Sequence, residues 1–143
     1  MQWNNVDDLT KGYIDDILQI SSGLVQYQIT ERIDVDAFPA KVDGYVYDAQ
    51  TFIDVLRGAS RPYMPQEADY YAIIKHFDVL QRVANNEIDE VWVFSFPHAG
   101  FYESIMGGPD AFWCNAPPLH NTEASKRRFV MMGFSYERGI GEM

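Results

Sequence analysis

Two short runs in the second half of the chain are apolar at nearly every position, and they constrain the fold more than any other feature. They cover residues 91–96, Val-Trp-Val-Phe-Ser-Phe, and residues 129–134, Phe-Val-Met-Met-Gly-Phe. A strand with one face in water alternates apolar and polar residues, whereas a strand covered on both faces is apolar throughout. The two runs therefore predict buried strands, and we expect residues 91–96 to be the central strand of the sheet.

The remaining periodic segments predict three helices and one more strand. Apolar residues recur at helical spacing over residues 6–20, over residues 49–56 after the N-cap Asp48, and over residues 73–84. Residues 25–36 alternate with a period of two, which is typical of a long, half-exposed strand. Glu31 breaks that alternation, and we interpret it as a bulge or the end of the strand, with a functional carboxylate as the alternative.

Length and composition favour one packed domain. A chain of 143 residues that is 47% hydrophobic can bury a sizeable core, and no repeat or interior linker divides it. The elements predict an α/β fold over residues 1–143, a mixed or mostly parallel sheet with helices packed on it. No run approaches the roughly 18 apolar residues of a membrane span, and no signal peptide is present, so the location in the cell stays open.

Charge and motifs exclude several classes of function. The net charge of −10 repels a phosphate backbone, so we expect no nucleic-acid partner, and the basic triplet 126–128 is interpreted as a solvated guard of the strand that follows. Cys114 is the single cysteine, which excludes an internal disulfide, and we favour an inert thiol over a nucleophile. The glycine-rich motifs of dinucleotide enzymes, P-loop NTPases and serine hydrolases are absent.

The segment between the two apolar runs is the candidate site. Residues 97–122 form a long loop that carries its own aromatic residues, and loops of that length in compact domains are usually functional or disordered. It leaves the carboxyl end of a predicted buried strand, which is where open α/β sheets hold their ligands. Residues 135–142 leave the same edge if the two strands are parallel neighbours, so Glu137 or Glu142 would approach Glu103.

The polar residues of these two segments supply the candidate roles. A pair of carboxylates suits general acid and base catalysis, imidazole and carboxylate groups are zinc ligands, and aromatic rings stack on sugars. The competing interpretations are an aromatic mini-core for the loop and a helix start for residues 137–138. We assign catalysis to Glu103, Glu137 and Arg138, substrate contacts to Tyr102, Trp113 and Asn115, and ligation of a divalent metal to His98 and Glu103.

Four strings resemble a bacterial protein family that has no established activity. They are Glu-Val-Trp at 90–92, Phe-Tyr-Glu-Ser-Ile-Met-Gly-Gly-Pro at 101–109, Phe-Trp-Cys-Asn-Ala-Pro-Pro at 112–118 and Tyr-Glu-Arg-Gly-Ile-Gly-Glu-Met at 136–143. Members are often large and exported, so the resemblance implies an extracellular setting. In that family the last string continues into a helix with Glu, His and Arg, which implies that this chain is a fragment truncated at Met143.

Three functions remain open. The first is a hydrolase-like domain, with or without a metal, that acts on an extracellular glycan or peptide. It predicts that Glu103→Gln abolishes turnover without lowering the melting temperature. The second is a non-catalytic carbohydrate-binding module, for which Trp113→Ala abolishes binding and Glu103→Gln does not. The third is a structural module of a larger protein, for which neither change affects any ligand.

Overall fold

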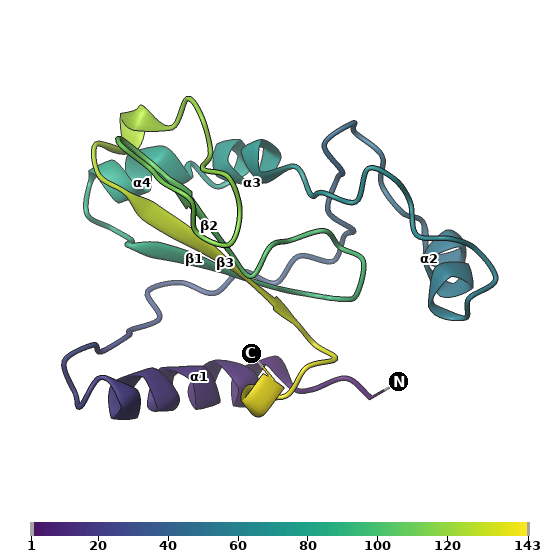
Figure 1. Cartoon of the computed structure of the whole chain (residues 1–143), viewed down its shortest axis with the longest axis horizontal. Helices are drawn as coiled ribbons and strands as arrows, with labels where there is room; N and C mark the ends of the chain where they lie inside the picture. The colour runs from purple at the N-terminus through teal and green to yellow at the C-terminus, as the bar shows by residue number, and fades with distance from the viewer. Residues whose placement is uncertain (1, 143) are drawn as a thin grey trace.

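The computed structural model describes residues 2–142 and contains a three-stranded mixed sheet (Figure 1). Strand β1 (Glu90–Ser95) pairs in parallel with β3 (Phe129–Ser135), and β2 (Ser104–Gly107) pairs antiparallel with the other edge of β3. The predicted α/β class and mixed sheet are confirmed. The predicted central strand is wrong, because β1 lies at an edge and β3 lies in the middle.

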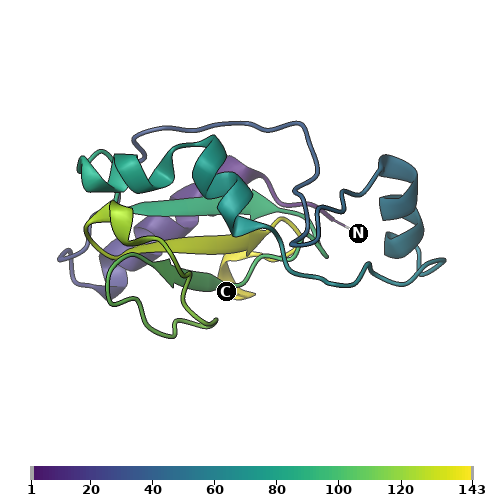
Figure 2. The same cartoon turned by 90° about the horizontal axis from the view of Figure 1, so that it is seen from above.

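Helices cover both faces of the sheet, which explains why the two runs are apolar throughout. Helix α1 (Val6–Ile20) packs Leu9 and Tyr13 against Phe134 of β3. Helices α3 (Tyr70–His76) and α4 (Val79–Ala84) lie on the opposite face, where Phe129 and Met131 are buried. Figures 1 and 2 show the sheet between these two layers. Alternate residues of β3 thus enter different cores, as the pleat of a strand requires.

The helix predicted over residues 73–84 is divided in two. Asp78 adopts a left-handed conformation with φ 52°, so the chain turns between α3 and α4. Asn85 is the C-cap of α4. Helix α1 matches its prediction and is capped by Asn5, whose side chain accepts hydrogen bonds from the amides of Asp7 and Asp8. Two short 3₁₀ helices, η1 (Glu123–Ser125) and η2 (Ile140–Glu142), complete the elements.

The strand predicted over residues 25–36 is wrong. This segment is extended but pairs with no strand, and most of its side chains are exposed. Side chains hold it instead: the Tyr27 hydroxyl donates to Glu90 at 2.6 Å, and Glu31 forms an ion pair with Arg82 at 2.5 Å. The predicted bulge at Glu31 therefore has no strand to interrupt. Alternation marks an extended backbone, but only a partner edge makes that backbone a strand.

A lobe built around α2 (Ala49–Leu56) projects from the body of the molecule at the carboxyl ends of β1 and β3, as Figures 1 and 2 show. This α2 lobe, residues 38–65, has its own aromatic cluster, in which Phe38 and Phe52 pack against Phe96 at ring distances of 5.1 and 4.7 Å. Phe96 directly follows β1. The lobe is therefore joined to the sheet at the edge where the candidate site was predicted.

The basic triplet differs from its prediction at its middle residue. Arg127 donates to the carbonyl oxygens of Val83 and Ile88, at 2.9 and 2.7 Å, and pairs with Asp89 at 2.5 Å. Its guanidinium thus joins the end of α4 to the start of β1, whereas Lys126 and Arg128 are exposed as expected. The helix that the resemblance continues past Met143 lies outside the described residues.

Candidate functional site

The parallel pairing of β1 and β3 brings the two predicted segments together. The ends of the two strands are register partners, Ser95 with Ser135, so the chain leaves both strands at one edge of the sheet. A cleft of about 410 Å³ opens there. Six of the seven predicted site residues line it: His98, Tyr102, Glu103, Asn115, Glu137 and Arg138.

Glu103 and Arg138 form the polar centre of the cleft. An Arg138 guanidinium nitrogen lies 3.2 Å from the Glu103 carboxylate and donates a hydrogen bond to it. The side chains keep 61% and 47% of their accessible surface, so solvent reaches both. An ion pair with this exposure contributes little to stability, at most about 1 kcal/mol. Loss of this ion pair on ligand binding would therefore cost the fold little.

Trp113 is the predicted site residue that the structure does not bring to the cleft. Its side chain is 66% exposed and is not among the residues that line the cleft, although its neighbour Asn115 is. Two aromatic residues that do line the cleft, Phe96 and Phe134, pack against rings in the interior. Phe134 stacks on Phe94 and on Tyr13, at ring distances of 4.7 and 4.8 Å. Few ring faces therefore remain free for a sugar.

The loop that follows β1 is held by a buried lysine that sequence reasoning missed. Lys41 is 1% exposed, and its ammonium donates to the carbonyl oxygens of Gln66, His98 and Ala99 at 2.7, 2.6 and 2.9 Å. Burial lowers the pKa of Lys41. The three acceptors oppose that effect, because a neutral amine has only two N–H donors. Lys41 lies about sixty residues before the loop, and no local sequence pattern predicts that its side chain is buried.

Two glycines allow the loop to pack closely. Gly100 has φ 96°, and a Cβ there would lie 2.8 Å from the Ala68 amide nitrogen. At Gly133 in β3, a Cβ would lie 2.8 Å from the Cβ of Phe101, and the Gly133 amide donates to the Glu103 carbonyl at 3.1 Å. A glycine inside a strand often marks the close approach of another backbone, so this signal was present in the sequence.

Two residues of the cleft lining have a left-handed backbone conformation, which six other non-glycine residues among residues 2–142 share. His98 and Asn115 both have left-handed backbone angles, with φ 65° and 59°. Such conformations cost energy in residues other than glycine and tend to cluster at active sites and ligand clamps. On β3, the Ser135 hydroxyl is buried and has no hydrogen-bond partner within residues 2–142.

The predicted metal ligands do not form a metal site by themselves. Catalytic zinc sites in proteins use three side-chain ligands. Among residues 2–142, no three His, Cys, Asp or Glu side chains are grouped so that they would hold a metal ion. His98 and Glu103 both line the cleft. Within residues 2–142, no hydrogen bond or ion pair joins these two side chains. Cys114 is half-buried, and its thiol lies 3.2 Å from the Ser104 hydroxyl.

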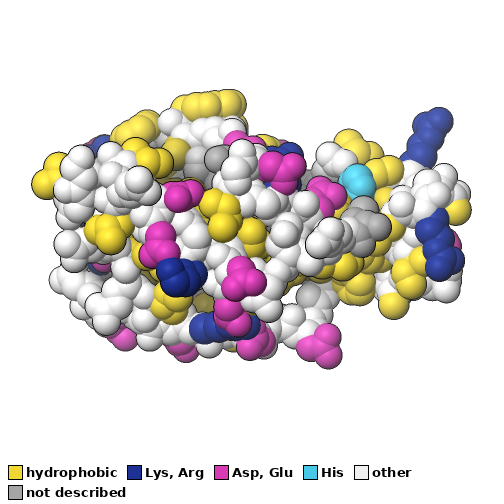
Figure 3. All heavy atoms as spheres, turned by 90° about the horizontal axis from the view of Figure 1, so that it is seen from below, with side chains coloured by type: hydrophobic (Ala, Val, Ile, Leu, Met, Phe, Trp, Pro, Cys, Tyr) yellow, Lys and Arg dark blue, Asp and Glu magenta, His cyan; other side chains and the backbone are white. Residues whose placement is uncertain are grey.

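Acidic side chains are spread over the face that carries α1, among hydrophobic ones (Figure 3). The aspartates at positions 7, 8, 15 and 16 of this helix are exposed. No helix in the described part of the chain has the length and apolar character that crossing a membrane requires.

Comparisons with protein-family models, with curated proteins and with solved structures found no match to this chain.

Proposed function

We propose that the chain binds a peptide segment in the cleft at the carboxyl edge of β1 and β3. The observation that carries this proposal is the convergence of six polar side chains, from three separate segments of the chain, on one cleft. Its volume of about 410 Å³ lies within the roughly 300–1,000 Å³ of typical ligand sites. Carboxylates that accept, a guanidinium that donates and an amide that does both match the alternating donors and acceptors of a peptide backbone.

The arrangement of aromatic residues favours a peptide over a glycan. Sugar recognition needs open ring faces, and Trp113, the best candidate for stacking, does not line the cleft. Tyr102 does line the cleft, but its hydroxyl is engaged by Glu67. A peptide requires no stacking platform. The charged groups of Glu103 and Arg138 can form hydrogen bonds with the amide and carbonyl groups of a peptide.

Titration of the ¹⁵N-labelled chain with a degenerate pool of acetylated, amidated hexapeptides tests this proposal. We expect amide shifts at residues 97–103, 115 and 133–138, and at least a fivefold loss of apparent affinity in Arg138→Gln. Arg61→Gln is the matched control, because Arg61 is exposed and lies in the α2 lobe outside the cleft lining. Shifts centred on Trp113 in a parallel titration with oligosaccharides, without peptide shifts, would instead establish the glycan interpretation.

A second candidate function, hydrolysis of the bound polymer, is supported by one observation. Glu103, Glu137 and His98 line the same cleft, and each carries a group that can accept or donate a proton. Glu103 is the best candidate for the general acid or base, because its carboxylate lines the cleft and pairs with Arg138. A metal held partly by His98 and Glu103 remains a proposal within this second function.

Mass spectrometry of the same peptide pool after incubation with the protein separates the two functions. For hydrolysis, Glu103→Gln abolishes product formation while the melting temperature stays unchanged, because the Glu103 carboxylate is exposed. Glu123→Gln, also exposed and outside the cleft lining, keeps full activity. If EDTA stops product formation and zinc restores it, hydrolysis requires a metal ion. Intact peptides under all conditions would leave binding as the function.

A further inference from the structure

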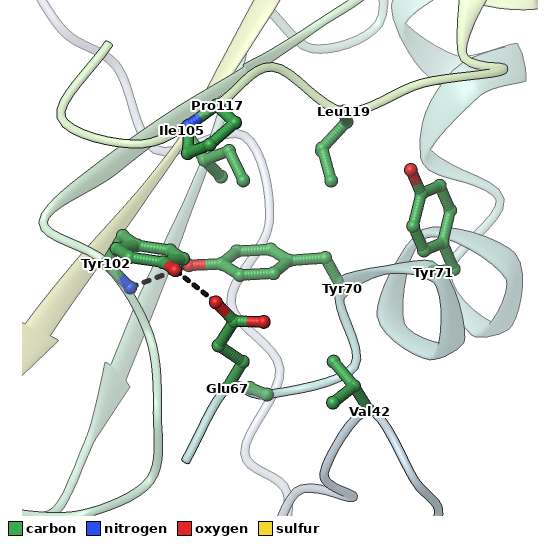
Figure 4. A pocket seen from close by; sticks show the side chains of 9 residues that line it. Val42, Glu67, Tyr70, Tyr71, Tyr102, Ile105, Pro117 and Leu119 are labelled. Atoms are coloured by element: carbon green, nitrogen blue, oxygen red, sulfur yellow. Dashed lines mark hydrogen bonds between the residues drawn. The ribbon is translucent and has the colours of Figure 1, made fainter. Parts of the chain in front are cut away.

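A second and smaller pocket, of about 170 Å³, shares Tyr102 with the cleft (Figure 4). Three tyrosines border it, at positions 70, 71 and 102, together with the Glu67 carboxylate. Aliphatic side chains, including Ile105 and Leu119, complete its wall. Its chemistry thus differs from that of the cleft: ring faces and methyl groups surround one negative charge.

Hydrogen bonds fix the tyrosine rings before any ligand arrives. The Tyr102 hydroxyl donates to Glu67, and the Tyr102 amide donates to the Tyr70 hydroxyl at 2.8 Å. The planes of these two rings differ by 14°, and Figure 4 shows them side by side. The Tyr71 hydroxyl donates to the His120 carbonyl at 3.1 Å and accepts from the His120 amide at 3.0 Å. A wall held in this way loses little entropy on binding.

The charge of Glu67 has no counter-ion within residues 2–142. In that part of the chain, no Lys or Arg nitrogen lies within 4.0 Å of the Glu67 carboxylate. One carboxylate oxygen accepts from Tyr102, and Figure 4 shows the other pointing away from that hydroxyl. An ionised carboxylate can accept several hydrogen bonds, so the second oxygen is available to a donor.

We infer that this pocket binds an alkylammonium group, namely the side chain of a lysine. The ammonium would donate to Glu67 and lie near the tyrosine rings, whose faces attract cations. The four methylenes of lysine would contact Ile105 and Leu119. The size agrees, because a cavity of about 150 Å³ holds the six carbon atoms of benzene and a butylammonium ion has five non-hydrogen atoms. The net charge of −10 also favours a cationic ligand.

This inference deepens the proposed function and rests on it for the peptide, though not for the ammonium group. Tyr102 lines both the cleft and the pocket, so a peptide bound in the cleft can place one side chain beside Glu67. The pocket would then select peptides with lysine at one position. A neutral residue of the same length there would form no charge-assisted hydrogen bond with Glu67, which is the basis of the selection.

Titration with n-butylammonium chloride, followed by methyl and aromatic NMR signals, tests the pocket alone. We expect shifts at Val42, Ile105 and Leu119, and saturation in the millimolar range. n-Butanol at the same ionic strength should bind at least fivefold more weakly. Glu67→Gln should weaken butylammonium at least fivefold, while Glu123→Gln leaves it unchanged. Tyr71→Leu is a second test, because Tyr71 is 48% exposed and its loss removes one ring from the wall.

Equal binding of butylammonium and butanol, or binding that Glu67→Gln and Tyr71→Leu leave unchanged, overturns the inference. Two peptide pools that carry either lysine or norleucine at each position in turn then connect the pocket to the cleft. If both pools shift the cleft residues equally, the cleft binds peptides and the lysine pocket is wrong. If butylammonium binds and neither pool shifts the cleft, the pocket stands and the proposed peptide function fails.

Discussion

Replacing Lys41 by methionine removes the cation that holds the loop after β1. The side chains have similar length, so the change deletes the charge and three hydrogen bonds while it largely keeps the packing. Three carbonyl oxygens then lose their donor: that of Ala99, which is buried, and those of Gln66 and His98, which are partly buried. Each of these oxygens accepts a hydrogen bond from a charged group, and an acceptor that is left unpaired away from water costs free energy.

The expected loss of stability is about 3 kcal/mol. Three hydrogen bonds to a charged group contribute roughly 1.5–3 kcal/mol each, or about 4.5–9 kcal/mol together. Methionine needs no desolvation of an ammonium, and this returns several kcal/mol. A net loss of about 3 kcal/mol lowers the melting temperature of a domain of this size by about 6–12 °C. The loss also concentrates at residues 97–100, where two of the three acceptors lie.

Urea unfolding and native-state hydrogen exchange measure the two parts of this prediction. Lys41→Met should lower the unfolding free energy by about 3 kcal/mol and speed amide exchange in residues 97–100. Lys75→Met, at an exposed position of α3, is the control and should stay within about 0.5 kcal/mol. If Lys41→Met costs no more than this control, the buried ammonium does not hold the loop and our interpretation of the site is wrong.

Three further predictions concern the glycine of β3, the arginine that joins α4 to β1, and alkaline pH. Gly133→Ala places a methyl group against the loop and should cost about 1–3 kcal/mol by thermal unfolding, whereas Gly141→Ala meets no atom within 4 Å and should be neutral. Arg127→Met leaves two carbonyl oxygens without a donor and should cost about 2 kcal/mol in urea unfolding; an equal cost for Lys126→Met would contradict this. Burial raises the pKa of Tyr70 to about 12, so the folded state holds a proton that the unfolded state loses near pH 10. Stability should therefore be unaffected by this group below pH 10 and fall between about pH 10 and 12, and a flat unfolding free energy over that window refutes the assignment.

The α/β class and the convergence of most site residues could be predicted because both follow from short-range patterns. The apolar runs indicate two buried strands, and parallel pairing places their carboxyl ends at one edge. Glu103 and Arg138 could therefore be expected close together, although they lie 35 residues apart. The helix after Asp48 was predictable for a similar reason, since the N-cap and the apolar stripe are both local signals.

The division of the predicted helix at Asp78 is a local error, whereas the other errors concern contacts between distant segments. Residues 25–36 have the alternation of a strand, but the neighbouring edge belongs to β1 and is bound through the side chain of Tyr27. Val93 and its neighbours are as apolar as β3, so the composition of β1 could not show that it lies at an edge. Lys41 and Arg127 look like ordinary surface cations in sequence, and only the carbonyl groups around them explain why Lys41 is buried and Arg127 half-buried.

The position of β3 in the sheet has a consequence for synthesis of the chain. Within residues 2–142, β1 and β2 pair only with β3, so this sheet cannot form before the ribosome has delivered residues 129–135. The roughly 30 residues between β1 and β3 take a few seconds to translate at about 5–20 residues per second. During that interval the apolar residues of β1 are without their sheet partner, as is the edge that later forms the cleft. The apolar residues of β1 are therefore prone to aggregate during synthesis until β3 is available.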